Sequence, residues 1–232
     1  MRGIVSTAAA ILLATAPTSA AQRRQALPAF DSGAIVISAP ATDPASPDIF
    51  GTVALGAGVT AYGARWRRVS AADEYDPRVR ALAAAAVAAG SGPLSRLAAV
   101  HADVGRRIRW RGDLETYHVS DYWAQAGETL TRGEGDSEDI AILKMQVLKA
   151  TGFPARDIYL SIGRDRQRGA EAMLLVRIGS HFYALDDRSP APLRATAGSR
   201  FRPVITLGRG GAWIHGRRIA DRRARTASAV LR

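Results

Sequence analysis

The sequence predicts an α+β domain, in which N-terminal helices pack on an antiparallel sheet. Helical periodicity of apolar residues dominates residues 77–150, and strand-like alternation dominates residues 156–217. Helices followed by strands in this order are typical of α+β folds. A chain of 232 residues with 47% hydrophobic residues can bury one sizeable core, so we expect a single domain.

The first 20 residues have the order of a secretory signal peptide. Arg2 is followed by an apolar stretch from Ile4 to Ala16, and small residues surround Ala20. The stretch is too short, and too interrupted by Pro17, to span a bilayer. We therefore expect cleavage near Ala20 and an exported product without a membrane-spanning segment, located in the periplasm of a Gram-negative cell.

Residues 21–63 are rich in Pro, Gly, Ala and Ser and predict an extended arm. Short strands are expected in it only at Ala34–Ser38 and Thr52–Leu55. The folded domain is then expected over residues 64–219. The basic tail at residues 220–232 is expected to be frayed or disordered.

The first two helices are marked by proline at their first position. One is expected from Pro77 to Ala89, with Asp76 as N-cap and Gly90 after its end. The second begins at Pro93. Its predicted apolar stripe consists of Leu94, Leu97, His101, Val104 and Ile108. A histidine on such a stripe is expected to be a packed side chain and not a ligand.

A third helix and a set of strands complete the prediction. The helix starts at Asp136 and ends before Gly152. The strands are expected at Arg156–Ile162, Ala170–Ile178, His181–Leu185 and Trp213–Arg217. Gly179 and Ser180 are expected to form a two-residue hairpin turn between the second and third of these strands.

The hairpin turn fixes which side chains share a face. With a two-residue turn, His181 lies opposite Ile178, and Asp186 lies opposite Met173. Glu171 is then diagonal to Asp186 on the same face, whereas His181 points to the other face.

Charge and composition limit the classes of partner. The net charge of +11 and the pI near 11.0 are those of many nucleic-acid-binding proteins. Here the positive charge is almost all arginine and is spread along the chain, which indicates codon usage in a GC-rich genome, so no nucleic acid is expected. A basic protein that binds anionic surfaces remains an alternative. The absence of cysteine excludes disulfides and cysteine metal sites.

Four motifs occur in a fixed order in the second half of the chain. They are DYWAQAGETLTRGEGDSEDIAILKMQVLKATGFP at residues 121–154, LLVRIG at 174–179, ALDDRS at 184–189 and WIHG at 213–216. In this order they resemble the bacterial transglutaminase-like cysteine proteases, and among these the type that processes adhesins in the periplasm. The resemblance implies a papain/transglutaminase-like core and a Cys-His-Asp triad. The motifs place the cysteine on Ser137, the histidine on Glu171 and the aspartate on Asp186, so two of the three residues are changed.

These changes argue against catalysis. A helix N-terminus and an imidazole can lower the pKa of a cysteine from about 8.5 far enough to populate the thiolate. Serine needs a positioned base instead, and a carboxylate such as Glu171, with a reference pKa near 4.3, is a weak one. Glu171 and Asp186 on one face also repel, so we expect a shared proton, an arginine or a cation between them. A hydrolase acting through Ser137, or through the acid pair, is the alternative.

The acids beside Ser137 have two interpretations. The resemblance implies a calcium site, because the adhesin-processing relatives hold Ca²⁺ with the two acids that flank the cysteine, here Asp136 and Glu138. Two side chains supply fewer than the six to eight oxygen ligands that Ca²⁺ takes. The alternative is helix-start electrostatics, with Asp136 as a cap and Asp139 reaching back to it.

The sequence therefore favours an exported, inactive homologue of a cysteine protease. The partner expected for it is a protein or peptide, such as an adhesin or a membrane-bound receptor for a cyclic dinucleotide. Trp123 and Trp213 are expected to be core residues, and His215 is a lone histidine that could reach the cleft.

Overall fold

The computed structural model describes residues 46–58, 60–71, 73 and 75–217. The expected signal peptide, the expected strand at Ala34–Ser38 and the basic tail lie outside these residues. Within them, no helix has the length and apolar character needed to cross a membrane.

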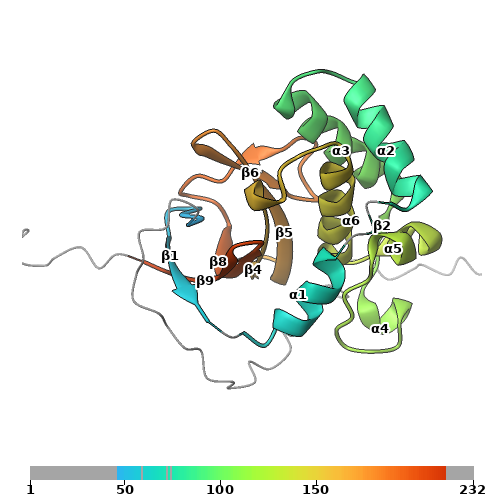
Figure 1. Ribbon diagram of the computed structural model, residues 1–232. Helices are drawn as coiled ribbons and strands as arrows, with labels where there is room; N and C mark the ends of the chain where they lie inside the picture. Colours follow the sequence, from blue (N-terminus) through green and yellow to red (C-terminus); the bar gives the residue numbers. More distant parts are fainter. Residues whose placement is uncertain (1–45, 59, 72, 74, 218–232) are drawn as a thin grey trace, which may run out of the picture.

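Helices form one layer of the molecule (Figure 1). They are α1 (Gly63–Ser70), α2 (Pro77–Ala88), α3 (Pro93–Arg107), α4 (Asp113–Thr116), α5 (Ala126–Arg132) and α6 (Ser137–Ala150), with a 3₁₀ turn η1 at Ala155–Asp157. The expected helices at residues 77–89, from 93 and at 136–151 correspond to α2, α3 and α6. The predicted cap is present, because the Asp76 side chain accepts a hydrogen bond from the N–H of Arg78 at 2.8 Å.

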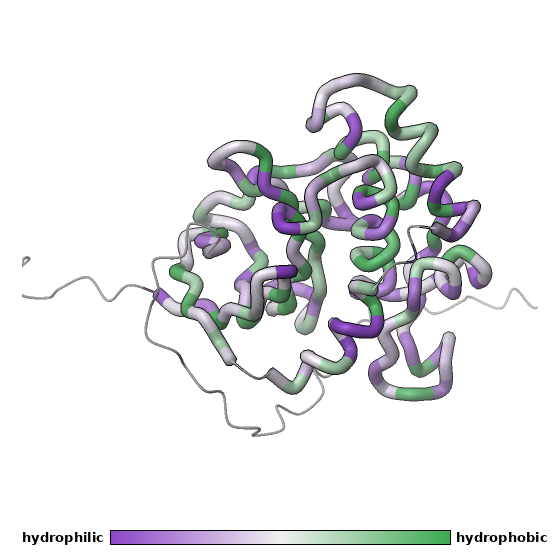
Figure 2. The backbone as a smooth tube through the Cα atoms, viewed as in Figure 1, coloured by the Kyte–Doolittle hydropathy of each residue, from purple (hydrophilic) through white to green (hydrophobic). Residues whose placement is uncertain are grey.

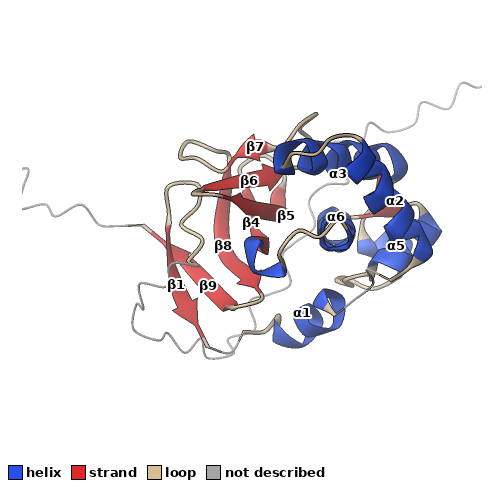
Figure 3. Cartoon of the chain, turned by 45° about the horizontal axis from the view of Figure 1, so that its top comes forward, coloured by secondary structure: helices blue, strands red, loops and turns tan. Residues whose placement is uncertain are grey.

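The second layer is an antiparallel sheet. Its strands, in spatial order, are β1 (Val53–Ala57), β9 (Gly211–Gly216), β8 (Phe201–Gly208), β4 (Ile158–Asp165), β5 (Gly169–Ile178), β6 (His181–Leu185) and β7 (Leu193–Arg194). A separate parallel pair joins β2 (Arg109–Trp110) to β3 (Glu134–Gly135). Figure 3 shows α6 end-on, between this sheet and the outer helices α2, α3 and α5. The α+β fold with N-terminal helices on an antiparallel sheet is therefore confirmed.

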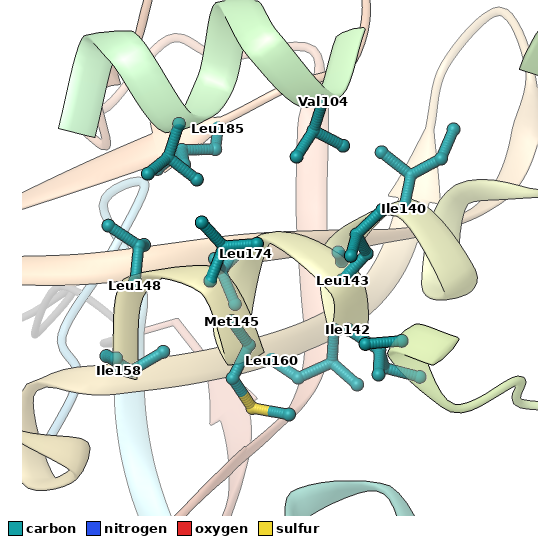
Figure 4. Close-up of a cluster of buried hydrophobic side chains, with 14 of the residues drawn as sticks. Val104, Ile140, Ile142, Leu143, Met145, Leu148, Ile158, Leu160, Leu174 and Leu185 are labelled. Atoms are coloured by element: carbon teal, nitrogen blue, oxygen red, sulfur yellow. The ribbon is translucent and has the colours of Figure 1, made fainter. Parts of the chain in front are cut away.

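Helix α6 is the centre of the core. Eleven of its fourteen residues are buried, because the sheet covers one side and α2, α3 and α5 cover the other. Figure 4 shows Ile140, Leu143 and Leu148 of α6 between Val104 of α3 and the strand residues. Its buried polar side chains are paired, as in the hydrogen bonds of Lys144 to Leu185 and of Gln146 to Val69.

The sheet has a different core on each face. On β5, Ala172, Leu174 and Val176 belong to the cluster that contains α6. Met173 and Leu175 belong to a second cluster, which includes Tyr159 and Trp213. Successive side chains of a strand alternate between faces, so even-numbered residues of β5 face α6 and odd-numbered ones face away.

Several details differ from the sequence-based expectations. Leu94 was placed on the apolar stripe of α3 but is 48% exposed, whereas Val100 is buried in its stead. Strand β8 was not predicted. Helix α1 was not predicted either, because it carries three arginines and buries only Val69; it appears as a hydrophilic segment in Figure 2.

Candidate functional site

Ser137 is the first residue of α6 and lies against β5. Its side chain is buried, with 9% of the residue exposed. Its Oγ accepts a hydrogen bond from the N–H of Ala172 at 3.0 Å and donates one to Oε2 of Glu138 at 3.0 Å. The hydroxyl proton is therefore directed at the neighbouring carboxylate on the same helix.

The hairpin register between β5 and β6 is as predicted. Ile178 pairs with His181 and Leu174 with Leu185, which confirms the two-residue turn. Leu185 is the last residue of β6 and belongs to the α6 cluster, and Asp186 follows it. No hydrogen bond or ion pair among the described residues joins Glu171 or Asp186 to Ser137.

Glu171 and Asp186 instead belong to a network with two arginines. Arg168 lies 2.8 Å from Glu171 and 3.3 Å from Asp187. Arg188 lies 2.7 Å from Asp186, and it also approaches Asp165 at 3.0 Å. A shared proton, an arginine or a cation was expected beside the two acids, and the structure places an arginine next to each of them.

The two acids of this network differ in basicity. Burial raises the pKa of Glu171 to about 7, although the charge of Arg168 opposes the rise. Burial also acts on Asp186, but hydrogen bonds and charge from Arg188 outweigh it and hold the pKa of Asp186 below its usual value. Near neutral pH, Glu171 therefore holds a proton more readily than Asp186 does.

None of the four histidines of the chain makes a contact with Ser137. His101 is buried and its Nε2 lies 2.7 Å from the carbonyl oxygen of Ser189. His181 contacts Arg194, and His118 is exposed. His215 lies between the hydroxyl groups of two threonines in the second core, and not in the cleft beside α6.

A cluster of carboxylates surrounds the start of α6. The carboxylate oxygens of Asp113, Asp136 and Asp139 lie within 4.8 Å of one another, and so do those of Asp113, Asp121 and Glu138. Asp113 belongs to both groups, so the five acids form one cluster. Helix α4 places Asp113 there, although it lies more than twenty residues before α6 in the sequence.

The electrostatics of the cluster favour a cation. Burial, followed by the neighbouring acids, raises the pKa of Asp113 to about 7 and that of Asp139 to about 8. The same causes raise the pKa of Asp136 and of Glu138. Asp113, Asp136 and Asp139 each have one buried carboxylate oxygen without a hydrogen-bond partner among the described residues. Buried, unpartnered carboxylate oxygens in close contact are the ligands that Ca²⁺ prefers.

One half of the capping interpretation is present, because the Asp139 carboxylate accepts a hydrogen bond from the backbone N–H of Asp136. Asp136 occupies the N-cap position of α6, but its side chain makes no capping hydrogen bond. Asp139 accepts a hydrogen bond from the N–H of Ala124 at 2.7 Å. Sequence reasoning missed Asp113 and Asp121 because they lie far from Ser137 in the chain, and only their residue type could have suggested them.

A buried lysine lies beneath the β6 end of the site. Lys144 of α6 is 1% exposed and donates a hydrogen bond from Nζ to the carbonyl oxygen of Leu185 at 3.1 Å. Burial lowers the pKa of this lysine to about 8. It connects α6 to the end of β6, directly before Asp186 and Asp187.

A central helix whose N-terminus meets an antiparallel sheet, with a small hydroxyl residue at the nucleophile position, defines a protein of the papain/transglutaminase-like class. Comparison with known families is more specific. A model described as bacterial transglutaminase-like cysteine proteinase, BTLCP, matches residues 58–199, which is more than half of the chain. The chain therefore belongs to this family.

Solved structures agree with this fold. Calcium-bound LapG of Legionella pneumophila is 24% identical, with a TM-score of 0.50, over 64% of this chain and 84% of that chain. EGTA-treated LapG of the same organism is 22% identical, with a TM-score of 0.51, over 70% of this chain and 90% of that chain. At these identities the likeness concerns the fold alone. No curated protein matches the sequence.

Proposed function

We propose that this chain is an exported, catalytically inactive member of its family that binds a protein or peptide partner without cleaving it. The observation that carries the proposal is the environment of Ser137, whose hydroxyl is bonded to Glu138 and to the N–H of Ala172. A serine nucleophile needs a positioned base of suitable pKa, and imidazole usually supplies it. None of the histidines contacts Ser137, and a carboxylate is a weak base.

The geometry supports a revised position for the missing histidine. Ala172 is the β5 residue that lies on the α6 face and touches Ser137, whereas Glu171 faces the second core. We therefore place the family's histidine on Ala172. In this arrangement a methyl group replaces the imidazole, so the Ser137 hydroxyl donates its hydrogen bond to the Glu138 carboxylate and not to an imidazole.

The activity test is direct. The protein is incubated with an adhesin fragment and, separately, with a small activated ester, and product is followed over time. We expect no turnover, because both the thiol and the imidazole are missing. Turnover that the change Ser137→Ala abolishes would show that the protein is a serine hydrolase.

We further propose that the carboxylate cluster holds Ca²⁺. Asp136 and Glu138 are the ligands expected from the sequence, and the arrangement adds Asp113, Asp121 and Asp139 as donors. One LapG structure of Legionella pneumophila is described as calcium-bound, which supports the choice of metal. Bound Ca²⁺ would neutralise the mutual repulsion of the acids and hold α4, the segment before α5 and the start of α6 together. In this role it stabilises the cleft and takes no part in chemistry.

The class of partner follows from the family. Proteinases bind polypeptide substrates, so a cleft retained without its nucleophile is suited to a protein or peptide, such as an adhesin or a membrane-bound receptor. The predicted signal peptide places this encounter in the periplasm. Isothermal titration with an adhesin fragment is expected to show saturable binding with no cleavage of the fragment. Absence of binding to both an adhesin and a receptor domain would contradict the proposal.

One observation favours a second candidate function, a hydrolase that uses an acid pair. Glu171 and Asp186 belong to one network, and their pKa values are pushed apart, the first to about 7 and the second below its usual value. Such a difference is found in pairs that divide the roles of acid and base. Turnover lost in Glu171→Gln but kept in Ser137→Ala would identify this function.

A further inference from the structure

A polar cavity opens on the face of the sheet that points away from α6. Its volume is about 290 Å³, and it lies between the segment before β1, the turn between β4 and β5, and the ends of β8 and β9. The helices cover the opposite face of the sheet (Figure 3). The cavity is therefore separate from Ser137 and from the carboxylate cluster.

Three arginines from three different segments line this cavity. Arg166 lies in the turn between β4 and β5, Arg202 is in β8, and Arg217 follows β9. All three are exposed at the rim, and none forms an ion pair within the described part of the chain. No aspartate or glutamate is among the residues that line the cavity. Three like charges around one opening repel one another, and an anion between them would remove that cost.

The wall of the cavity carries neutral polar groups. His215 has Nδ1 2.8 Å from Oγ1 of Thr52 and Nε2 2.8 Å from Oγ1 of Thr206. Burial lowers the pKa of His215 to about 4, so this imidazole is uncharged at neutral pH. The positive charge of the cavity therefore comes from the arginines, while Thr52, Ser199 and His215 line it as uncharged polar residues.

We propose that this cavity binds the phosphate group of a small phosphate ester, with Arg166, Arg202 and Arg217 of its lining as the source of positive charge. Arginine is suited to this role because its planar fork matches phosphate oxygens and stays charged. The volume is at the lower end of ligand sites, about 300–1,000 Å³, which favours a small ester over a nucleotide. The ester can be a free metabolite or the headgroup of a lipid, since both present the same group.

Isothermal titration of the full chain with glycerol 3-phosphate tests the proposal. The pocket variant carries Arg166→Gln, Arg202→Gln and Arg217→Gln. The control variant carries three changes of the same charge at exposed arginines of the helical layer: Arg67→Gln, Arg80→Gln and Arg107→Gln. We expect saturable binding by wild type and control, and a loss of about tenfold or more in the pocket variant.

Sedimentation with vesicles of phosphatidylcholine containing phosphatidic acid distinguishes the two sources. Vesicle binding that the pocket variant loses and the control keeps, without binding of the free ester, identifies the lipid headgroup as the source. Equal loss in both variants would mean attraction by net charge alone and would overturn the proposal. Retained binding in the pocket variant would also overturn it. Circular dichroism confirms that both variants are folded. None of these outcomes depends on Ser137, so they leave the proposed function untouched.

Discussion

Replacing Asp113 by asparagine should stabilise the protein without calcium and weaken its response to calcium. Asp113 is 1% exposed, and burial followed by the charges of Glu138 and Asp121 raises its pKa from 3.8 to about 7. At 1.36 kcal/mol for each pH unit between the two pKa values, keeping Asp113 ionised in the folded state costs about 4 kcal/mol.

The sign of the pH dependence follows from this difference. Because the folded state holds the Asp113 proton more tightly than the unfolded state, the cost is absent below about pH 4 and complete above about pH 7. In chelator, the free energy of unfolding of wild type should fall as pH rises through this window. The free energy of unfolding of the Asp113→Asn variant should fall less over the same window. At pH 7.5 this variant should be more stable than wild type by up to about 4 kcal/mol.

Calcium should narrow this difference in stability. A ligand bound only by the folded state adds about 2.7 kcal/mol at a hundredfold excess over its dissociation constant, which is about 5–10 °C in Tm for a chain of this size. Wild type should show this rise, whereas Asp113→Asn and the double variant Asp136→Asn with Glu138→Gln should show little of it. Urea unfolding at pH 5 and 7.5, in calcium and in chelator, measures both effects.

The control for this experiment is Asp103→Asn, which removes an acid of α3 outside the cluster. It should keep the calcium response of wild type. If wild type shows no calcium-dependent rise at millimolar Ca²⁺, the cluster is not a calcium site. If Asp113→Asn is less stable than wild type in chelator at pH 7.5, the argument from repulsion between buried acids is wrong.

Three further predictions concern Ser137, the packing of β4 on β8, and the buried Lys144. The double variant Ser137→Cys with Ala172→His should have a thiol that reacts with iodoacetamide faster than free cysteine at pH 6, because the imidazole lowers the pKa of the thiol. The double variant Ser137→Cys with Glu171→His should not show this faster reaction. The reverse result would place the histidine on Glu171. Gly163→Ala should lower the free energy of unfolding in urea by about 2 kcal/mol or more, since its Cβ would lie 2.2 Å from a backbone oxygen of β8; an unchanged midpoint would contradict this packing. Wild type should gain stability over Lys144→Met as pH rises from about 8 to 10.5, because the buried ammonium loses its charge in the folded state first; a constant difference across this range would show that Lys144 titrates normally.

Local signals determined much of the fold. Proline at the first position of α2 and α3, and Gly152 behind α6, fixed those helices closely because caps and stops act within a few residues. The hairpin register was equally local, since two turn residues, Gly179 and Ser180, decide it. The order of motifs around Ser137 predicted the family.

The tertiary structure decided which face of the sheet meets α6. The sequence predicted the hairpin register, but alternation along a strand has period two and cannot say which face carries the helix. The packing of Leu174 and Leu185 against α6 decided it, and the backbone N–H of Ala172 contacts Ser137.

Long-range folding also assembled the two polar sites. The sequence supplied Asp136 and Glu138 as adjacent acids, but Asp113 and Asp121 joined them through α4 and the loop after it. The arginines around the far cavity come from three segments between residues 166 and 217, and no spacing along the chain marks them. Local sequence specifies helices, turns and caps, because these depend on neighbouring residues. Which charged side chains share one small volume depends on how the sheet and helices pack, and only the folded chain determines that.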